Sequence, residues 1–521
     1  MSAATTSISL TDLGLIWPDG SVALEGITAS FGHGRTGLVG LNGSGKSTLL
    51  RLLAGELGPT TGTIQATGEI GYLAQNVTLG VGAAVADLLG IRRQLDALRA
   101  ILGGDASPEH FDALADRWEV ETEAEDALRA AGLPSTALDR EVGTLSGGET
   151  ILVAIAGLRL GGTPIVLLDE PTNNLDARAR SLLADMVRSW RGTLVVVSHD
   201  TELLELMDHT AELHEGALTM FGGPYSHYLA QLGAEQDAAK QAERTAEQAV
   251  RLEKRQRIEA ETKLAHRARK ARTDYANKRA PKIVMNGRRS FAEVSAGKLR
   301  TEFDGKVADA RAALEEAERR VRDAAFIQID LPDPGVAAGR RLAELTIDDR
   351  TVVIQGPERV ALTGPNGAGK TTMLEALVGG EGLLTERIGY LPQRLDGLDE
   401  NATVLQNVAA AAPSVTEGEL RNRLARFLIR GDAVGRAVST LSGGERFRVA
   451  LARLLLADPP PQLLVLDEPT NNLDAQSVTQ LVDALAGYRG AVLVVSHDRS
   501  FLDRLDVKVR LELEQDNTMS G

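Results

Sequence analysis

The 521-residue sequence contains no cysteine, and aromatic residues make up only 3% of it. The lack of cysteine excludes disulfide bonds and cysteine-ligated metal centres, and it suits a reducing compartment. No apolar run approaches the roughly 18 residues that a membrane-spanning helix needs. Residues 1–10 also lack the basic flank and long apolar stretch of a secretory signal. We therefore expect a cytoplasmic protein, and the length allows two to four domains.

The sequence carries five motifs twice, in the same order and about 300 residues apart. Glycine-rich loops occur at 40–47 and 364–371, and Leu-Ser-Gly-Gly-Glu occurs at 145–149 and 441–445. A nine-residue string, Leu-Asp-Glu-Pro-Thr-Asn-Asn-Leu-Asp, is identical at 168–176 and 466–474. Gln75 and Gln393 end matching Ile-Gly-Tyr-Leu-x-Gln strings, and His199 and His497 lie in Ser-His-Asp strings. One such set of motifs makes half of an ATP site, so two sets in one chain can complete each other's sites.

The glycine-rich loops have the Gly-x4-Gly-Lys-Ser/Thr pattern of a P-loop, between an apolar strand and an apolar helix. In that context backbone N–H groups and the helix N-terminus cradle the phosphates of ATP. The lysine reaches the β- and γ-phosphates, and the hydroxyl that follows it holds Mg²⁺. The predicted nucleotide-binding residues of these loops are Gly40, Asn42, Gly43, Gly45, Lys46, Ser47 and Thr48, and Gly364, Asn366, Gly367, Gly369, Lys370, Thr371 and Thr372.

Acidic pairs end the next apolar runs. Asp169 and Asp467 stand where a P-loop ATPase places its Mg²⁺-binding aspartate. Glu170 and Glu468 follow directly and are candidates to orient or deprotonate the attacking water. We also predict catalytic contacts for the histidines and glutamines of the repeated strings, as residues that meet the γ-phosphate (His199, His497) and position Mg²⁺ or water (Gln75, Gln393).

Short apolar runs alternate with helical stretches in both halves, which predicts an α/β fold with parallel sheets. We expect one cassette over residues 1–232 and another over 325–521, joined by a helical segment over 233–324. Copy one has about 22 more residues than copy two between the glutamine and Leu-Ser-Gly-Gly-Glu. Leucines at helical spacing there predict a short helical arm at about 91–128.

The segment between the cassettes is rich in Ala, Glu, Arg and Lys, which favours long helices. Pro281 and Asn286-Gly287 are expected to break it into two antiparallel helices with a tip at 280–290. Residues 263–300 contain twelve basic and two acidic residues, a net charge of +10, which leaves −25 for the rest of the chain. A solvated helix face normally mixes both signs, so we predict that this segment binds a polyanion through phosphate contacts.

Together these motifs resemble an ATP-binding cassette ATPase. The Asn-Asn-Leu-Asp extension, the two cassettes in one chain and the charged linker are similar to the ABC-F subfamily, over nearly the whole chain. The resemblance implies a monomer whose cassettes pair head to tail. Each ATP site then takes the signature residues of the opposite cassette: Ser442, Gly443 and Gly444 complete site one at Lys46, and Ser146, Gly147 and Gly148 complete site two at Lys370.

The resemblance also implies a partner, the ribosome. In ABC-F proteins the linker hairpin contacts large-subunit rRNA and the P-site tRNA near the peptidyl-transferase centre, and the resemblance implies the same contacts for the hairpin of this chain. The protein is then a translation factor or an antibiotic-resistance protein that protects the ribosome, and no residue pattern chooses between these roles or names an antibiotic.

The two copies differ in ways that predict unequal sites. Cassettes of this family stack adenine on an aromatic side chain about two dozen residues before the P-loop, where copy one has Trp17; a core tryptophan is the plain alternative. Copy two has no aromatic residue between 327 and 389. We hypothesise that site two holds ATP more loosely or turns it over more slowly.

Two other functions fit the cassettes. The chain resembles the ATPase subunit of an exporter, for example one for macrolides, which needs separate membrane partners and gives no role to the basic hairpin. It also resembles DNA-repair cassette ATPases, but those with this layout often carry a basic C-terminal coiled coil, whereas residues 512–516 here are acidic.

Overall fold

The computed structural model describes residues 6–75, 82–173, 175–276, 282–320, 331–347, 350–393, 397–471 and 473–513. The chain forms two compact units. One contains both motif-bearing halves, Met1–Ser226 and Phe326–Gly521, and the other is His227–Ala325.

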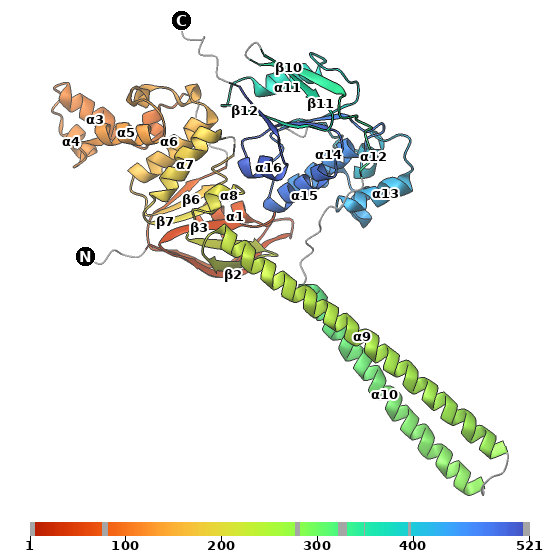
Figure 1. The fold of residues 1–521 in the computed structure, drawn as a ribbon. Coiled ribbons are helices and arrows are strands. Elements are labelled where there is room, and N and C mark those ends of the chain that lie inside the picture. Colours follow the sequence, from red (N-terminus) through yellow and green to blue (C-terminus); the bar gives the residue numbers. More distant parts are fainter. Residues whose placement is uncertain are drawn as a thin grey trace. The chain divides into compact units, whose positions relative to one another are not determined.

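A six-stranded sheet forms the centre of the first half, with the strand order β5-β6-β7-β3-β8-β9 (Figure 1). Neighbouring strands are parallel except β8 and β9, which are antiparallel. Strands β6 and β7 are buried along their whole length, which explains their continuous apolar sequence. The strands are β3 (Gly34–Val39), β5 (Ile70–Leu73), β6 (Ile165–Asp169), β7 (Thr193–Val197), β8 (His209–His214) and β9 (Ala217–Gly222).

A three-stranded antiparallel sheet, in the order β2-β1-β4, belongs to the same half. Its strands are β1 (Ile8–Ile16), β2 (Val22–Phe31) and β4 (Thr61–Ala66). Apolar side chains of this sheet, of the six-stranded sheet and of α1 share one buried core. The helices around the sheets are α1 (Lys46–Leu53), α6 (Gly147–Leu160), α7 (Ala177–Arg188) and α8 (Thr201–Leu204).

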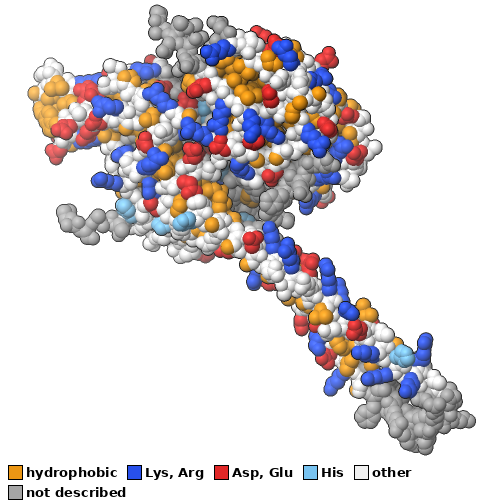
Figure 2. All heavy atoms as spheres, in the orientation of Figure 1, with side chains coloured by type: hydrophobic (Ala, Val, Ile, Leu, Met, Phe, Trp, Pro, Cys, Tyr) orange, Lys and Arg blue, Asp and Glu red, His pale blue; other side chains and the backbone are white. Residues whose placement is uncertain are grey.

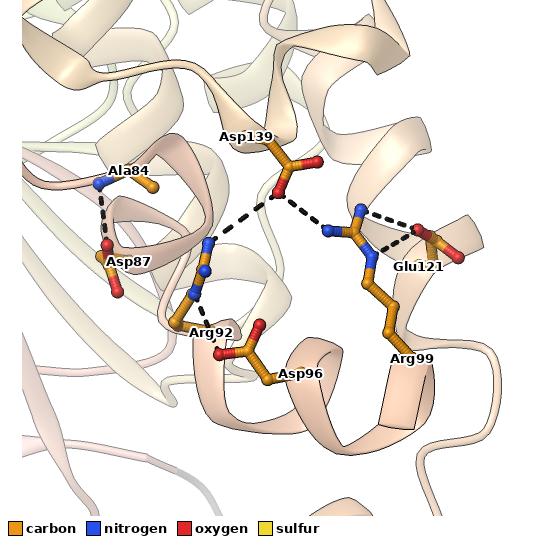
Figure 3. A network of polar contacts seen from close by, with 7 residues as sticks. All are labelled: Ala84, Asp87, Arg92, Asp96, Arg99, Glu121 and Asp139. Atoms are coloured by element: carbon orange, nitrogen blue, oxygen red, sulfur yellow. Dashed lines mark hydrogen bonds and ion pairs between the residues drawn. The ribbon is translucent and has the colours of Figure 1, made fainter. Parts of the chain in front are cut away.

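The segment of copy one that includes the extra residues forms α2 (Val85–Leu88), α3 (Arg92–Leu102), α4 (Pro108–Leu114) and α5 (Val120–Ala130), followed by 3-10 turns at Ser135–Asp139 and Val142–Thr144. Arg99 joins three of these elements, because its guanidinium lies 3.0 Å from Glu121 on α5 and 2.8 Å from Asp139 (Figure 3). Leu102 and Trp118 remain exposed. Figure 2 shows hydrophobic side chains gathered on the surface over these helices. Buried apolar side chains, among them Leu95, Leu114, Val120 and Leu128, pack these helices together, and the polar network adds to that packing.

The second half repeats the first around a five-stranded parallel sheet with the order β13-β14-β15-β12-β16. This order matches β5-β6-β7-β3-β8, so the repeated motifs occupy equivalent strand ends. The sheet strands are β12 (Arg359–Thr363), β13 (Ile388–Leu391), β14 (Leu463–Asp467), β15 (Ala491–Val495) and β16 (Val509–Glu512), with a separate hairpin of β10 (Arg341–Ile347) and β11 (Arg350–Gln355). The predicted fold class, two tandem α/β cassettes, is confirmed.

Helices pack on both faces of this second sheet in two buried clusters. They are α11 (Lys370–Val378), α12 (Val404–Ala409), α13 (Glu417–Arg426), α14 (Gly443–Leu455), α15 (Ala475–Ala486) and α16 (Arg499–Arg504), with 3-10 turns at Gly431–Gly435 and Val438–Thr440.

The second unit is built on two long helices, α9 (Tyr225–Ala276) and α10 (Lys282–Arg320). They pair antiparallel: Arg257 lies 3.0 Å from Asp304, and Gln236 donates a hydrogen bond to the carbonyl of Arg320. Val250 and Val307 are buried in the seam between them. Among the described residues, no helix combines the length and the apolar character needed to cross a bilayer.

The predicted break at Asn286-Gly287 is wrong, because α10 continues through both residues. One glycine costs a helix only about 1 kcal/mol relative to alanine, and the surrounding helix formers offset that. Residues 277–281, which include the first two residues of the predicted tip at 280–290, lie outside the described residues.

Candidate active sites

Each P-loop leaves the carboxyl end of a central strand and enters a helix. The first glycine sits at φ 151° in copy one and 143° in copy two. A Cβ on Gly40 would lie 2.4 Å from the carbonyl oxygen of Leu213, and one on Gly364 would lie 2.4 Å from that of Leu513. No side chain fits at either turn, so both positions require glycine and the loop backbone stays open to a phosphate.

The P-loop lysines are buried and point along their own loops. The Lys46 Nζ donates to the carbonyls of Gly40, at 2.7 Å, and Leu41, at 3.0 Å. The Lys370 Nζ donates to those of Gly364 and Pro365, both at 2.8 Å. Burial lowers the pKa of both lysines, while nearby carboxylates, Glu170 for Lys46 and Glu468 for Lys370, oppose that shift. Each ammonium group therefore lies within its P-loop, where it could bind a phosphate.

The two candidate catalytic glutamates share an unusual backbone. Glu170 has φ 49° and Glu468 has φ 44°, in the left-handed region that L-residues normally avoid. Their backbone N–H groups donate to the carbonyls of Val197 and Val495 on the neighbouring strands, at 2.9 Å in both copies. This turn directs each carboxylate toward the histidine that follows the neighbouring strand.

The glutamate and histidine side chains meet in both copies. The His199 Nε2 lies 3.0 Å from the Glu170 Oε1, and the His497 Nε2 lies 3.3 Å from the Glu468 Oε1. Burial raises the pKa of Glu170, and it raises that of Glu468 to about 7. Burial lowers the pKa of His199, and it lowers that of His497 to about 4. The imidazoles are therefore neutral at pH 7, and the glutamates are tuned toward accepting a proton.

The aspartates before these glutamates carry unsatisfied oxygens. Among the described residues, the buried Asp169 Oδ1 and both carboxylate oxygens of Asp467 lack a hydrogen-bond partner. Burial raises the pKa of both aspartates, and the hydroxyls of Ser47 and Thr371 face them and lower it. Buried carboxylate oxygens beside a hydroxyl are the oxygen donors that Mg²⁺ prefers. The residues present thus fit the predicted metal sites.

Three of the predicted residues stand apart from these clusters. Gln75 and Gln393 are exposed, two residues beyond β5 and β13. Trp17 is half-buried against the core of the first cassette, in a turn closed by its backbone bonds to Ser21 and Gly20. The structure therefore places Trp17 partly in the core, as a half-buried residue.

The signature serines cap the helices that follow them. Ser146 and Ser442 each accept from the backbone N–H of the glutamate three residues later, and that glutamate accepts in return from the serine N–H, at 2.8 Å in both copies. These are reciprocal capping boxes at the starts of α6 and α14. The serines and the glycines after them, Gly147 and Gly443, are exposed, so both helix N-termini are accessible to an anion.

Comparison with known proteins agrees with this geometry. A family profile described as "ABC transporter" matches residues 24–173 and 347–471. The tylosin resistance ATP-binding protein TlrC of Streptomyces fradiae is 33% identical, over 93% of this chain and 94% of its own. The chain belongs to the ATP-binding cassette family. The energy-dependent translational throttle protein EttA of Escherichia coli K12 is 31% identical, over 95% of this chain and 90% of its own. The present chain is an ABC-F ATPase.

Solved structures support the fold of this ABC-F protein. The structure titled "RNase-L Inhibitor" matches 95% of the chain and 86% of its own, with a TM-score of 0.54 and 21% identity. At that identity the likeness concerns the fold alone.

The sequence reasoning missed one residue pair of this ABC-F ATPase that links its cassettes. Asp474 accepts a hydrogen bond from the backbone N–H of Asn42, at 2.9 Å, and Asp176 accepts one from that of Asn366, at 3.3 Å. Both aspartates also cap the next helix, α15 and α7. The signal was present, since these aspartates end the identical nine-residue strings.

A second missed pair is Tyr72 and Tyr390. The Tyr72 hydroxyl donates to the Asp169 Oδ2 at 3.4 Å. Burial raises the pKa of Tyr72, and it raises that of Tyr390 to about 12, with the charge of Asp467 acting in the same direction. Each tyrosine therefore stays a neutral donor beside a metal-binding candidate.

Proposed function

We propose that this protein is a cytoplasmic, monomeric ATPase that acts on the ribosome through its hairpin, with ATP binding and hydrolysis controlling docking and release. Two relatives of nearly full coverage point to this function. One is named for resistance to tylosin and the other for throttling translation. The role is then regulation of translation or protection of the ribosome from an antibiotic.

We propose two composite ATP sites. Site one combines Lys46, Ser47, Gln75, Asp169, Glu170 and His199 with Ser442, Gly443 and Gly444; site two combines Lys370, Thr371, Gln393, Asp467, Glu468 and His497 with Ser146, Gly147 and Gly148. The contacts of Asp474 and Asp176 with the opposite P-loops support this pairing, because they bring residues of each cassette to the phosphate loop of the other.

The chemistry assigned to each site follows from its protonation states. The glutamate, whose pKa burial raises toward neutrality, takes a proton from the attacking water, and the neutral histidine lies beside it. The lysine neutralises the γ-phosphate. Mg²⁺, held by Ser47 and Asp169 or by Thr371 and Asp467, supplies further charge neutralisation when bound.

The observation that carries the ribosome assignment is the basic part of the hairpin. Its described basic side chains are exposed, and Figure 2 shows Lys and Arg side chains along the helices. These exposed residues are Lys263, Arg267, Arg269, Lys270, Lys298 and Arg300. We propose that they contact rRNA and the P-site tRNA, and that residues 280–290 reach toward the peptidyl-transferase centre. The negative charge on the rest of the chain limits other contacts with RNA.

The test is sedimentation with 70S ribosomes in the presence of ATP. The Glu170→Gln, Glu468→Gln double variant retains ATP, and we expect it to sediment with ribosomes and to arrest translation in vitro. The same variant with Lys263, Arg267, Arg269 and Lys270 replaced by Gln should stay in the supernatant. Free sedimentation of the double variant, with normal translation, would contradict the proposal.

A matched control removes the same number of charges elsewhere on the hairpin. Arg244, Arg251, Lys254 and Arg255 are also exposed on α9, but acidic residues lie among them, and Arg251 and Arg255 pair with Glu247 and Glu259. Replacing these four residues by Gln should leave sedimentation nearly unchanged.

A further inference from the structure

Arg180 of the first cassette has a bonding pattern that the ATP chemistry described above does not use. It lies on α7, four residues after the capping aspartate Asp176. Its Nε donates to the carbonyl of Leu175 at 3.1 Å, and its guanidinium lies 3.2 Å from the Asp200 Oδ2. Asp200 follows His199 directly and caps α8. Arg180 thus holds the turn that carries the histidine of site one.

The same guanidinium faces the second cassette. A cleft of about 210 Å³ is lined by Arg180 and Asp200 from one cassette and by His497, Asp498 and Arg499 from the other. Asp498 is the counterpart of Asp200, since it follows His497 and caps α16. Two equivalent capping carboxylates therefore line one cleft together with the guanidinium.

Electrostatics agree with this placement. Burial raises the pKa of Asp498; the charge of Arg180 opposes that rise, and Asp200 adds to it. Arg180 also lines the same cleft as His497, the histidine of site two. A cation near two carboxylates relieves their mutual repulsion. The Arg180–Asp200 pair is largely shielded from solvent, since its side chains are 22% and 11% exposed.

The second cassette has no arginine in the equivalent position. Four residues after Asp474, in the position equivalent to Arg180, the chain has Val478. Val478 is half-buried and packs against the apolar core of its own cassette. The otherwise matching halves therefore differ at a position that faces the opposite site.

We propose that Arg180 is a positioning residue for ATP site two, supplied by the first cassette, that ties the His199–Asp200 turn to the His497–Asp498 turn. Guanidinium has five N–H donors, and two are used by Leu175 and Asp200, which leaves three for the opposite turn. The turn beside site one thereby sets the geometry of site two, whereas site one receives no such group from Val478. This inference rests on the proposed assignment of the two sites.

The experiment isolates each site in the full-length protein. Glu170→Gln leaves site two active, and Glu468→Gln leaves site one active. In the Glu170→Gln background, Arg180→Val should lower kcat about tenfold with little change in KM, because a positioning contact acts mainly in the transition state. Arg180→Lys, which keeps the charge without the planar fork, should restore part of that loss. In the Glu468→Gln background Arg180→Val should lower kcat by a smaller factor, about twofold at most. Asp200 keeps its bonds to the backbone N–H of Leu203 and to the Ser198 hydroxyl there, and these still hold the His199 turn.

The matched control is Arg178→Val, an exposed arginine two residues earlier on the same helix, which should leave both backgrounds unchanged. Thermal unfolding checks the fold of each variant. If Arg180→Val unfolds, Asp200→Asn, which keeps a capping side chain, tests the same link and should also lower kcat in the Glu170→Gln background. An equal loss in both backgrounds, or no loss at site two, overturns the inference.

The outcomes also separate this inference from the site assignment. Wild-type hydrolysis in both single glutamate variants would overturn the assignment itself. Separable activities with no effect of Arg180→Val, Arg180→Lys or Asp200→Asn would overturn the role of Arg180 alone.

Discussion

Asp474 accepts a hydrogen bond at 2.9 Å from the backbone N–H of Asn42, which lies 432 residues earlier in the chain. The same carboxylate accepts from the backbone N–H of Ser477 at 2.7 Å. Burial acts to raise the pKa of Asp474, but these bonds hold it below its usual range, so the group stays charged. One side chain therefore begins a helix in the second cassette and contacts the P-loop of the first.

Replacement of this aspartate should separate its two roles. Asp474→Ala removes a helix cap, which costs about 1 kcal/mol of stability, and it also removes the contact with the P-loop of site one. We expect a lower kcat in the Glu468→Gln background, where only site one is active. The measurement is steady-state phosphate release together with thermal unfolding.

Thr416→Ala is the control for the capping effect, because Thr416 caps α13 within its own cassette. It should cause a similar loss of stability without a loss of kcat. If both variants lowered kcat equally, the contact with Asn42 would have no role in hydrolysis.

The two sites should differ in nucleotide affinity. Trp17 is half-buried in the first cassette, and the second cassette has no aromatic residue between 327 and 389. Loss of one base–aromatic stack costs about 1–3 kcal/mol. In the Glu170→Gln, Glu468→Gln protein, which binds ATP in both sites, we expect two Kd values. Trp17→Ala should raise the Kd of the tighter site about tenfold and leave that of the weaker site unchanged.

Fluorescent-nucleotide titration measures both constants. Equal affinities and equal single-turnover rates in the Glu170→Gln and Glu468→Gln proteins would contradict the asymmetry.

Binding of the hairpin to RNA should depend steeply on salt. Each phosphate contact that is lost lowers the slope of log K against log salt concentration by about 0.7–0.9. Replacing Lys263, Arg267, Arg269 and Lys270 by Gln should therefore reduce the slope by about 3, measured by ribosome binding at several salt concentrations. An unchanged slope would mean that these side chains do not contact phosphate.

The sequence predicted those parts of the sites that depend on local order. The strands, the P-loops, the Asp-Glu pairs and the histidines each follow from a short string whose neighbours determine its structure. The meeting of Glu170 with His199 also follows, since both end adjacent parallel strands. The catalytic, nucleotide-binding and metal-binding roles of these residues, and those of Gln75 and Gln393, remain predictions.

Contacts between distant elements were not predictable in the same way. The bond between Asn42 and Asp474 depends on how two whole cassettes pack; the repeated nine-residue string marks the aspartate but not its partner. Arg180 and Asp200 lie on different helices, so nothing in their spacing marks a pair. At Asn286-Gly287 the breaker residues suggested a turn, but the helical preference of the surrounding segment prevailed.

The central claim is that each cassette completes the ATP site of the other, and a bulky residue at the signature serine tests it most directly. Ser442 is exposed, so Ser442→Arg should fold, with thermal unfolding as the check. If Ser442 serves site one, Ser442→Arg should lower single-turnover hydrolysis about 10²-fold in the Glu468→Gln background and leave the Glu170→Gln background nearly unchanged. If Ser442→Arg instead abolished hydrolysis in the Glu170→Gln background, the serine would serve site two, on its own cassette, and the account would be contradicted.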